Sequence, residues 1–138
     1  MTKTAELWAP KSFWAAKPFV RDSVCNGCGT KGLGGLLVPD TLYGLSVTAA
    51  CNIHDWMYHH GQVIADKEEA DRAFLNNMIR IIEAHTKYGF IKFLRRRRAY
   101  KYYLSVKLFG GPAFWANKNR ADELADVNLD WDVDWDIV

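Results

Sequence analysis

Apolar residues recur at intervals of three and four along residues 66–82, which is the clearest pattern in the chain. They are Ala70, Ala73, Phe74, Met78, Ile81 and Ile82. A helix turns once every 3.6 residues, so this spacing places all of them on one face and predicts an amphipathic helix. Asp66 suits its N-cap, and Glu68 and Glu69 are favourable in the first turn.

A second helix is predicted just before it. Ser46 or Thr48 can cap a helix that runs to about His60, where Gly61 stops it. A linker of about five residues then joins the two helices, and so short a connection forces them to pack antiparallel.

The rest of the pattern predicts a mainly α protein. A third helix is expected over residues 91–108, and a short helix is expected between Pro10 and Pro18. We interpret the aromatic residues of this N-terminal stretch as core, with lipid anchors as the alternative; they are Trp8, Phe13 and Trp14. Residues 25–44 hold most of the glycines and should be loop throughout.

The C-terminal stretch, LDWDVDWDIV, alternates apolar and acidic residues, as a strand does. An isolated acidic strand has no reason to be stable, so we expect it to be flexible alone and extended when bound. We therefore expect one domain over residues 1–120, which is about the length of a single core, followed by an acidic aromatic tail over residues 121–138.

Charge separates these two parts. The formal charge is only +2, but residues 121–138 hold seven acidic residues and no basic one. The first 120 residues then carry 18 basic and 9 acidic residues. Such a basic body predicts an anionic partner: a lipid surface, nucleic acid or the tail itself.

Composition gives no sign of a membrane or secreted protein. The chain has no run of 18 apolar residues and no apolar leader at its N-terminus, so we expect synthesis in the cytoplasm. Three cysteines argue against a scaffold built from disulfides but leave one bridge or a metal site open.

The cysteines allow a zinc site. Cys25 and Cys28 form a C-x-x-C pair, and after 22 intervening residues Cys51 and His54 form a C-x-x-H pair. Thiolate and imidazole are the ligands that zinc prefers, so a structural or nucleic-acid-binding zinc module is one hypothesis.

The residues around His54 support a different chemistry. His54 and Tyr58 share one helix face, and antiparallel packing can bring Asp71 beside the imidazole. A carboxylate on one ring nitrogen fixes the tautomer and leaves the other nitrogen free to accept a proton from water. Asp55 beside a bend of glycine carbonyls would supply the hard oxygen ligands that calcium prefers.

Three stretches together resemble the phospholipase A2 superfamily, in particular its compact bacterial and parvoviral forms. They are CGTKG, HDWMY and ADRAF, which match the family's calcium loop, His-Asp helix and second antiparallel helix. The separation of 17 residues between His54 and Asp71 is similar to that of the compact forms. The resemblance covers about residues 24–82 and implies a phospholipase A2-like fold: two antiparallel core helices, a glycine-rich metal-binding loop and a third helix.

The resemblance also implies a reaction, the calcium-dependent hydrolysis of the sn-2 ester of phospholipids. His54 would take a proton from the attacking water, and Asp71, with Tyr58, would orient it. Calcium would be held by Asp55 and by loop carbonyls, and would bind the phosphate and stabilise the oxyanion. The carbonyls are those of Gly27, Gly29 and Gly32.

This chain departs from the family pattern in several places. Ala50 and Met57 stand where disulfide-rich members carry cysteines, and two residues rather than one separate the loop's Cys-Gly from its next glycine. Cys28 and Cys51 stand where a family disulfide would join loop to helix. A phospholipase-like fold that binds lipid or protein without catalysis is therefore a further hypothesis.

The expected partner is a phospholipid membrane surface, with nucleic acid less favoured. The basic run Arg95, Arg96, Arg97 and Arg98 is either a solvated helix face or a binding surface for anions. It could also receive the acidic tail or a protein partner. Intracellular, phage-encoded, virion-associated and released proteins would all fit these features.

Overall fold

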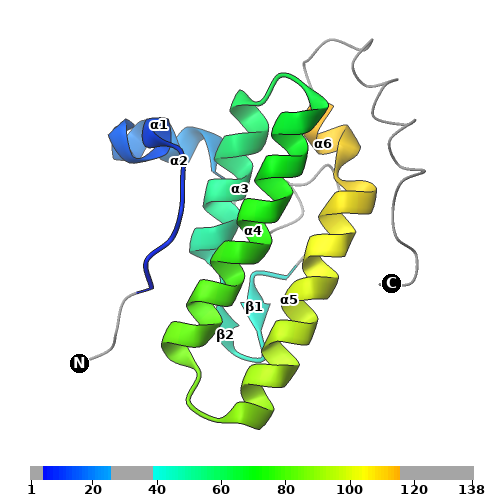
Figure 1. Cartoon of the computed structure of the whole chain (residues 1–138). Helices are drawn as coiled ribbons and strands as arrows, with labels where there is room; N and C mark the ends of the chain where they lie inside the picture. The colour runs from blue at the N-terminus through cyan, green and yellow to red at the C-terminus, as the bar shows by residue number, and fades with distance from the viewer. Residues whose placement is uncertain (1–4, 26–38, 116–138) are drawn as a thin grey trace.

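A computed structural model describes residues 5–25 and 39–115. Three long helices form the body of this part of the chain: α3 (Thr48–His60), α4 (Ile64–His85) and α5 (Gly89–Phe109). They lie side by side, with α4 packed against both α3 and α5 (Figure 1). The described part is therefore mainly helical, as the sequence predicts.

The predicted pair of antiparallel helices is present. Only residues 61–63 join α3 to α4, fewer than expected, so the chain reverses at once. Gly61 follows α3, and its N–H donates to the carbonyl of Met57 at 2.9 Å. A side chain at Gly61 could not fit, because a Cβ there would lie 2.6 Å from the ring of Phe114.

The N-terminus of α4 differs from the prediction. The helix begins at Ile64, and Asp66 lies in its first turn instead of at the N-cap. The carboxylate of Asp66 accepts hydrogen bonds from the backbone N–H groups of Gln62 and Val63 at 2.8 and 3.2 Å. Asp66 thus caps the helix from inside it, which satisfies backbone donors that would otherwise lack a partner.

The stretch expected to be loop contains a small hairpin. Strand β1 (Thr41–Leu42) pairs antiparallel with β2 (Leu45–Ser46). The two turn residues, Tyr43 and Gly44, both have positive φ, at 48° and 82°, as a two-residue hairpin turn of this hand requires. Strands of two residues are too short to give a sequence pattern, which explains why the prediction missed them. Residues 26–38 of this stretch lie outside the described part.

Two short helices precede the hairpin, where the sequence predicted one. Helix α1 (Lys11–Ala15) lies between the two prolines as expected, and α2 (Pro18–Val24) begins at the second proline. Pro18 suits a first helical position because its missing N–H would have no partner there. Phe13 is buried, but Trp8 and Trp14 are 40% and 54% exposed, so the core interpretation is wrong for Trp14 and only partly right for Trp8.

The extended segment before α1 is fastened to α4. The side-chain amide of Asn77 accepts from the N–H of Trp8 and donates to its carbonyl, both at 2.8 Å. Asn77 is fully buried, so these two bonds satisfy an amide that would otherwise be costly to bury. After α5, the short helix α6 (Gly111–Trp115) places Phe114 and Trp115 in the core.

Candidate active site

His54 and Asp71 meet between α3 and α4. Nε2 of His54 lies 2.8 Å from Oδ1 of Asp71, and both side chains are almost fully buried. Asp71 lies two turns into α4, where the antiparallel packing brings it level with His54. The proximity predicted from the sequence is therefore observed in the structure.

Two further groups complete the hydrogen bonding of the Asp71 carboxylate. The hydroxyl of Tyr58 donates to Oδ1 at 2.6 Å. The ammonium of Lys67 donates to Oδ2 at 3.0 Å, and also to the backbone carbonyls of Val106 and Lys107 at 3.2 Å. The sequence predicted a place for Tyr58 but none for Lys67, which is only 3% exposed.

Lys67 was missed because a lysine in the first turns of a helix normally lies in solvent. Its partners at the end of α5 are about forty residues away in the sequence, and no local sequence pattern indicates them. The spacing of four residues between Lys67 and Asp71 on one helix was the only available signal.

The surroundings of Asp71 keep it ionised. Burial alone would raise its pKa, but the hydrogen bond and charge of His54, the ammonium of Lys67 and the hydroxyl of Tyr58 together hold the pKa of Asp71 below its ordinary value. An ionised carboxylate can only accept, so Nε2 of His54 carries the proton that it donates to Asp71. The other ring nitrogen, Nδ1, is then the one that can accept a proton.

Aromatic packing fixes the plane of the imidazole. The ring of His54 lies 4.1 Å from that of Tyr58 and 4.8 Å from that of Phe74, measured between centroids. Gly110 lets the end of α5 approach this cluster, because a Cβ at Gly110 would lie 2.5 Å from the hydroxyl of Tyr58. The imidazole is thus positioned from three helices.

Asp55 lies near Cys25, the last residue that the structure describes before residues 26–38. Its side chain is buried on α3, 6% exposed, and its negative charge helps to raise the pKa of the Cys25 thiol. The predicted carbonyl ligands of Gly27, Gly29 and Gly32 lie outside the described residues. Within the described ranges, no three His, Cys, Asp or Glu side chains gather as a metal site.

The cysteines differ in state. Cys51 is bonded in a disulfide, whereas Cys25 is a free thiol that donates to the carbonyl of Asn52 at 3.1 Å. Burial first, and then the charge of Asp55, raise the pKa of Cys25 to about 11. Cys28, the partner that the family resemblance implies for Cys51, lies outside the described part.

The four arginines of the basic run have different surroundings. Arg95 is turned inward and donates to the carbonyls of Leu42 and Tyr43 and to the hydroxyl of Thr86, at 2.9–3.0 Å. Arg98 lies over the ring of Tyr43, 4.2 Å from its centroid. These two hold the hairpin on α5, whereas Arg96 and Arg97 lie on the outer side of the helix.

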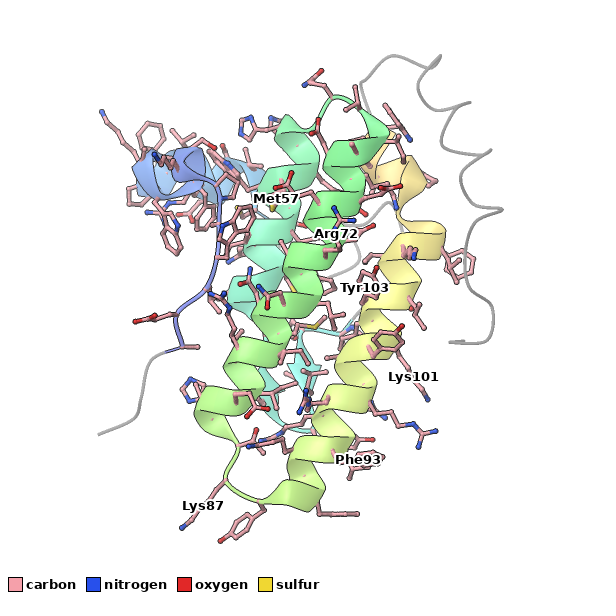
Figure 2. The ribbon with its side chains drawn as sticks, viewed as in Figure 1. Met57, Arg72, Lys87, Phe93, Lys101 and Tyr103 are labelled. Atoms are coloured by element: carbon pink, nitrogen blue, oxygen red, sulfur yellow. The ribbon has the colours of Figure 1, made fainter. Side chains whose placement is uncertain are left out.

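Figure 2 shows the two sides of α5. Tyr103 projects toward α4, whereas Phe93 and Lys101 project away from the bundle. Burial and the Asp71 carboxylate raise the pKa of Tyr103.

None of the described helices combines the length and apolar character needed to cross a membrane. Comparisons with protein-family models, with curated proteins and with solved structures found no match.

Proposed function

We propose that this protein hydrolyses the sn-2 ester of phospholipids with calcium, using His54 to activate water. The observation that carries the proposal is the buried pair of His54 Nε2 and Asp71 Oδ1 at 2.8 Å. This contact leaves Nδ1 as the proton acceptor, which is the arrangement of a general base held by a carboxylate.

Each neighbour of the pair has a role in this proposal. As Nδ1 takes the proton from water, the imidazole becomes positively charged, and the adjacent Asp71 carboxylate stabilises that charge. Tyr58 and Lys67 each donate to one oxygen of Asp71, so the carboxylate cannot rotate away from Nε2. Tyr58 and Lys67 are therefore positioning residues.

The donor set next to this pair fits calcium. Asp55 offers a buried carboxylate next to Cys25, where the glycine-rich stretch begins, and carboxylate and carbonyl oxygens are the ligands that calcium prefers. Calcium bound there would supply positive charge for the substrate phosphate and for the oxyanion that forms during hydrolysis. Asp55 is the only charged ligand in the proposed set.

An exposed apolar surface near the same region suits a lipid interface. Trp14 on α1 and Phe19 on α2 are 54% and 70% exposed. Their neighbours in the chain, Phe13 and Pro18, line a cavity of about 220 Å³, whose walls also include Cys25 and Asn52. Exposed aromatic side chains beside a cavity are typical of surfaces that contact lipid or protein.

The zinc hypothesis is less well supported by these residues. Zinc binds thiolates, but Cys51 is in a disulfide and therefore offers no thiolate. His54 could bind zinc only through Nδ1, because Nε2 is held by Asp71.

The test combines hydrolysis with calcium binding. Purified protein is given a phospholipid labelled in its sn-2 chain, with calcium or with a chelator, and its melting temperature is measured under both conditions. We expect calcium to raise the melting temperature and to be required for release of the sn-2 chain. His54→Gln should keep the fold and the calcium response but lower the rate by about 10²–10⁴-fold.

Two variants make the test specific. Asp55→Asn should lose the calcium response and the activity together, because it removes the charged ligand. His59→Gln is the matched control, since His59 is exposed on the same helix and should leave both unchanged. A stoichiometric zinc ion, unfolding on chelation and no calcium response would instead support the zinc module. A folded, calcium-binding protein without hydrolysis would support the non-catalytic hypothesis.

A further inference from the structure

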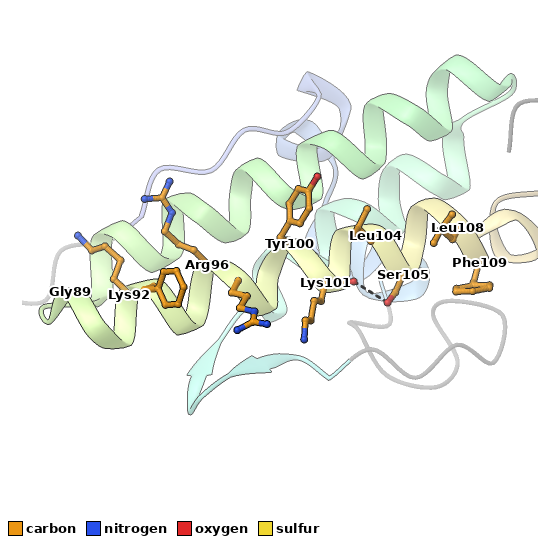
Figure 3. A pocket seen from close by; sticks show the side chains of 11 residues that line it. Gly89, Lys92, Arg96, Tyr100, Lys101, Leu104, Ser105, Leu108 and Phe109 are labelled. Atoms are coloured by element: carbon orange, nitrogen blue, oxygen red, sulfur yellow. Dashed lines mark hydrogen bonds between the residues drawn. The ribbon is translucent and has the colours of Figure 1, made fainter. Parts of the chain in front are cut away.

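The outer side of α5 carries a groove that the proposed active site does not use. It has a volume of about 790 Å³ and runs along the helix from Gly89 to Phe109 (Figure 3). Apolar side chains form much of its surface, among them Phe93, Leu104 and Leu108. Phe93 and Phe109 are 61% and 62% exposed, which is unusual for large apolar residues.

Basic side chains line the same groove. They are Lys92, Arg96, Arg97 and Lys101. Lys92 and Arg96 also contact Glu83 at 3.0 and 3.5 Å, but these pairs are partly exposed and therefore weak. Whatever covers this groove must combine apolar groups with negative charge.

We propose that the groove binds the chain's own C-terminal segment, residues 129–138. This segment, LDWDVDWDIV, holds four aspartates and no basic residue, and each aspartate lies between apolar residues. In an extended chain, successive side chains point to opposite sides. One side of the segment would then carry Trp131 and Trp135, and the other would carry the four aspartates and Val138.

The two surfaces are complementary in chemistry. The apolar side of the segment covers Phe93 and Phe109, which are otherwise open to water. The aspartates remain at the rim, where the long side chains of Arg97 and Lys101 can reach them. Such exposed ion pairs give orientation more than affinity, and apolar burial supplies most of the binding free energy.

The lengths also agree. The groove spans all 21 residues of α5, or about 30 Å at 1.5 Å per residue. Ten residues in extended form span about 33 Å. Helix α6 follows α5 directly and ends at Trp115, so the described part of the chain ends near the Phe109 end of the groove. The 13 residues between Trp115 and Leu129 are long enough to return the segment onto α5.

The first test is a zero-length carbodiimide cross-link on the full chain, read by mass spectrometry. We expect residues 130–136 to join Lys92 or Lys101 within one chain, and the yield to fall at high salt. Lys11 is the control, because it is exposed on α1, outside the groove. Equal yields at Lys11 and Lys101, or cross-links that form only between chains, would overturn the proposal.

The second test asks what the segment competes with. Replacing Trp131 and Trp135 by serine removes most of the apolar contact and should release the segment, which should tighten binding of the full chain to vesicles that contain phosphatidylserine by roughly fivefold for each basic residue released. Phosphatidylcholine vesicles should show no such gain. Adding Arg97→Gln and Lys101→Gln should remove it; a gain that persists in this variant would place the segment elsewhere. Neither test measures hydrolysis or calcium, so failure here leaves the proposed function standing.

Discussion

The ammonium of Lys67 lies 3.0 Å from Oδ2 of Asp71, one turn along α4, in a part of the protein from which water is excluded. Since Lys67 also donates to two carbonyls at the end of α5, it connects α5 to the proposed catalytic pair. A single buried cation thereby holds both a carboxylate and a helix terminus.

Lys67→Met should destabilise the fold by about 3–5 kcal/mol, because it leaves a buried carboxylate with one oxygen unpaired. Urea unfolding would measure this loss. The control is Lys92→Met, since Lys92 pairs with Glu83 at the surface and its loss should cost less than about 1 kcal/mol.

The double variant Lys67→Met with Asp71→Asn tests the same pair. It should be less destabilised than the sum of the two single variants, because the unpaired charge is gone. Additive effects would mean that the two side chains do not interact.

Asp71→Asn should slow turnover while calcium remains bound, since it disturbs only the tautomer and orientation of His54. Tyr58→Phe removes one donor to Asp71 but leaves the contact with His54, so it should slow turnover less. The initial rate of ester hydrolysis and the calcium-dependent melting temperature would check both. If Tyr58→Phe were the slower of the two, the hydroxyl itself would touch the reacting groups.

The lowered pKa of Asp71 predicts how stability depends on pH. A carboxyl group whose pKa is lower in the folded state adds stability above its unfolded pKa, near 3.8, and this stability is lost as pH falls toward the folded pKa. Wild type should therefore lose its advantage over Asp71→Asn below about pH 3.8. Urea unfolding of both proteins from about pH 6 to about pH 2 would show whether the two stabilities converge.

The Cys25 thiol should be unreactive. With a pKa raised from 9.0 to about 11, its thiolate fraction at pH 7 is about a hundredfold below that of an ordinary thiol. Labelling with iodoacetamide should be slow in the folded protein, faster in urea, and unaffected by metal chelators. Faster labelling after chelation would show that a metal had protected this thiol.

Helix periodicity made the candidate pair predictable. His54, Tyr58 and Asp71 lie on faces that a spacing of four residues and an antiparallel turn determine, so local rules were sufficient to bring them together. Lys67 and the inward position of Arg95 were not predictable in this way, because their partners are backbone carbonyls on distant elements. A side chain that donates to a backbone carbonyl needs no particular residue type as its partner, so the sequence gives no sign of the contact.

The same reasoning explains the errors near the N-terminus. Trp14 has the composition of a core residue, but α1 is only five residues long and cannot bury both Phe13 and its neighbour against α3. Which of two adjacent aromatic residues becomes buried depends on where the helix docks. That position is determined by α3 and α4, not by the local sequence.

The two hydrogen bonds between the Asn77 side chain and the backbone of Trp8 limit how far the chain can be shortened from its N-terminus. Deleting residues 1–4 leaves both hydrogen bonds between Trp8 and Asn77 in place, whereas deleting residues 1–9 would remove both partners of the amide, at a cost of about 1 kcal/mol for each hydrogen bond. An affinity tag can therefore replace the first four residues. Starting an expressed fragment at Pro10 would give a protein that melts earlier and aggregates through the uncovered face of α4.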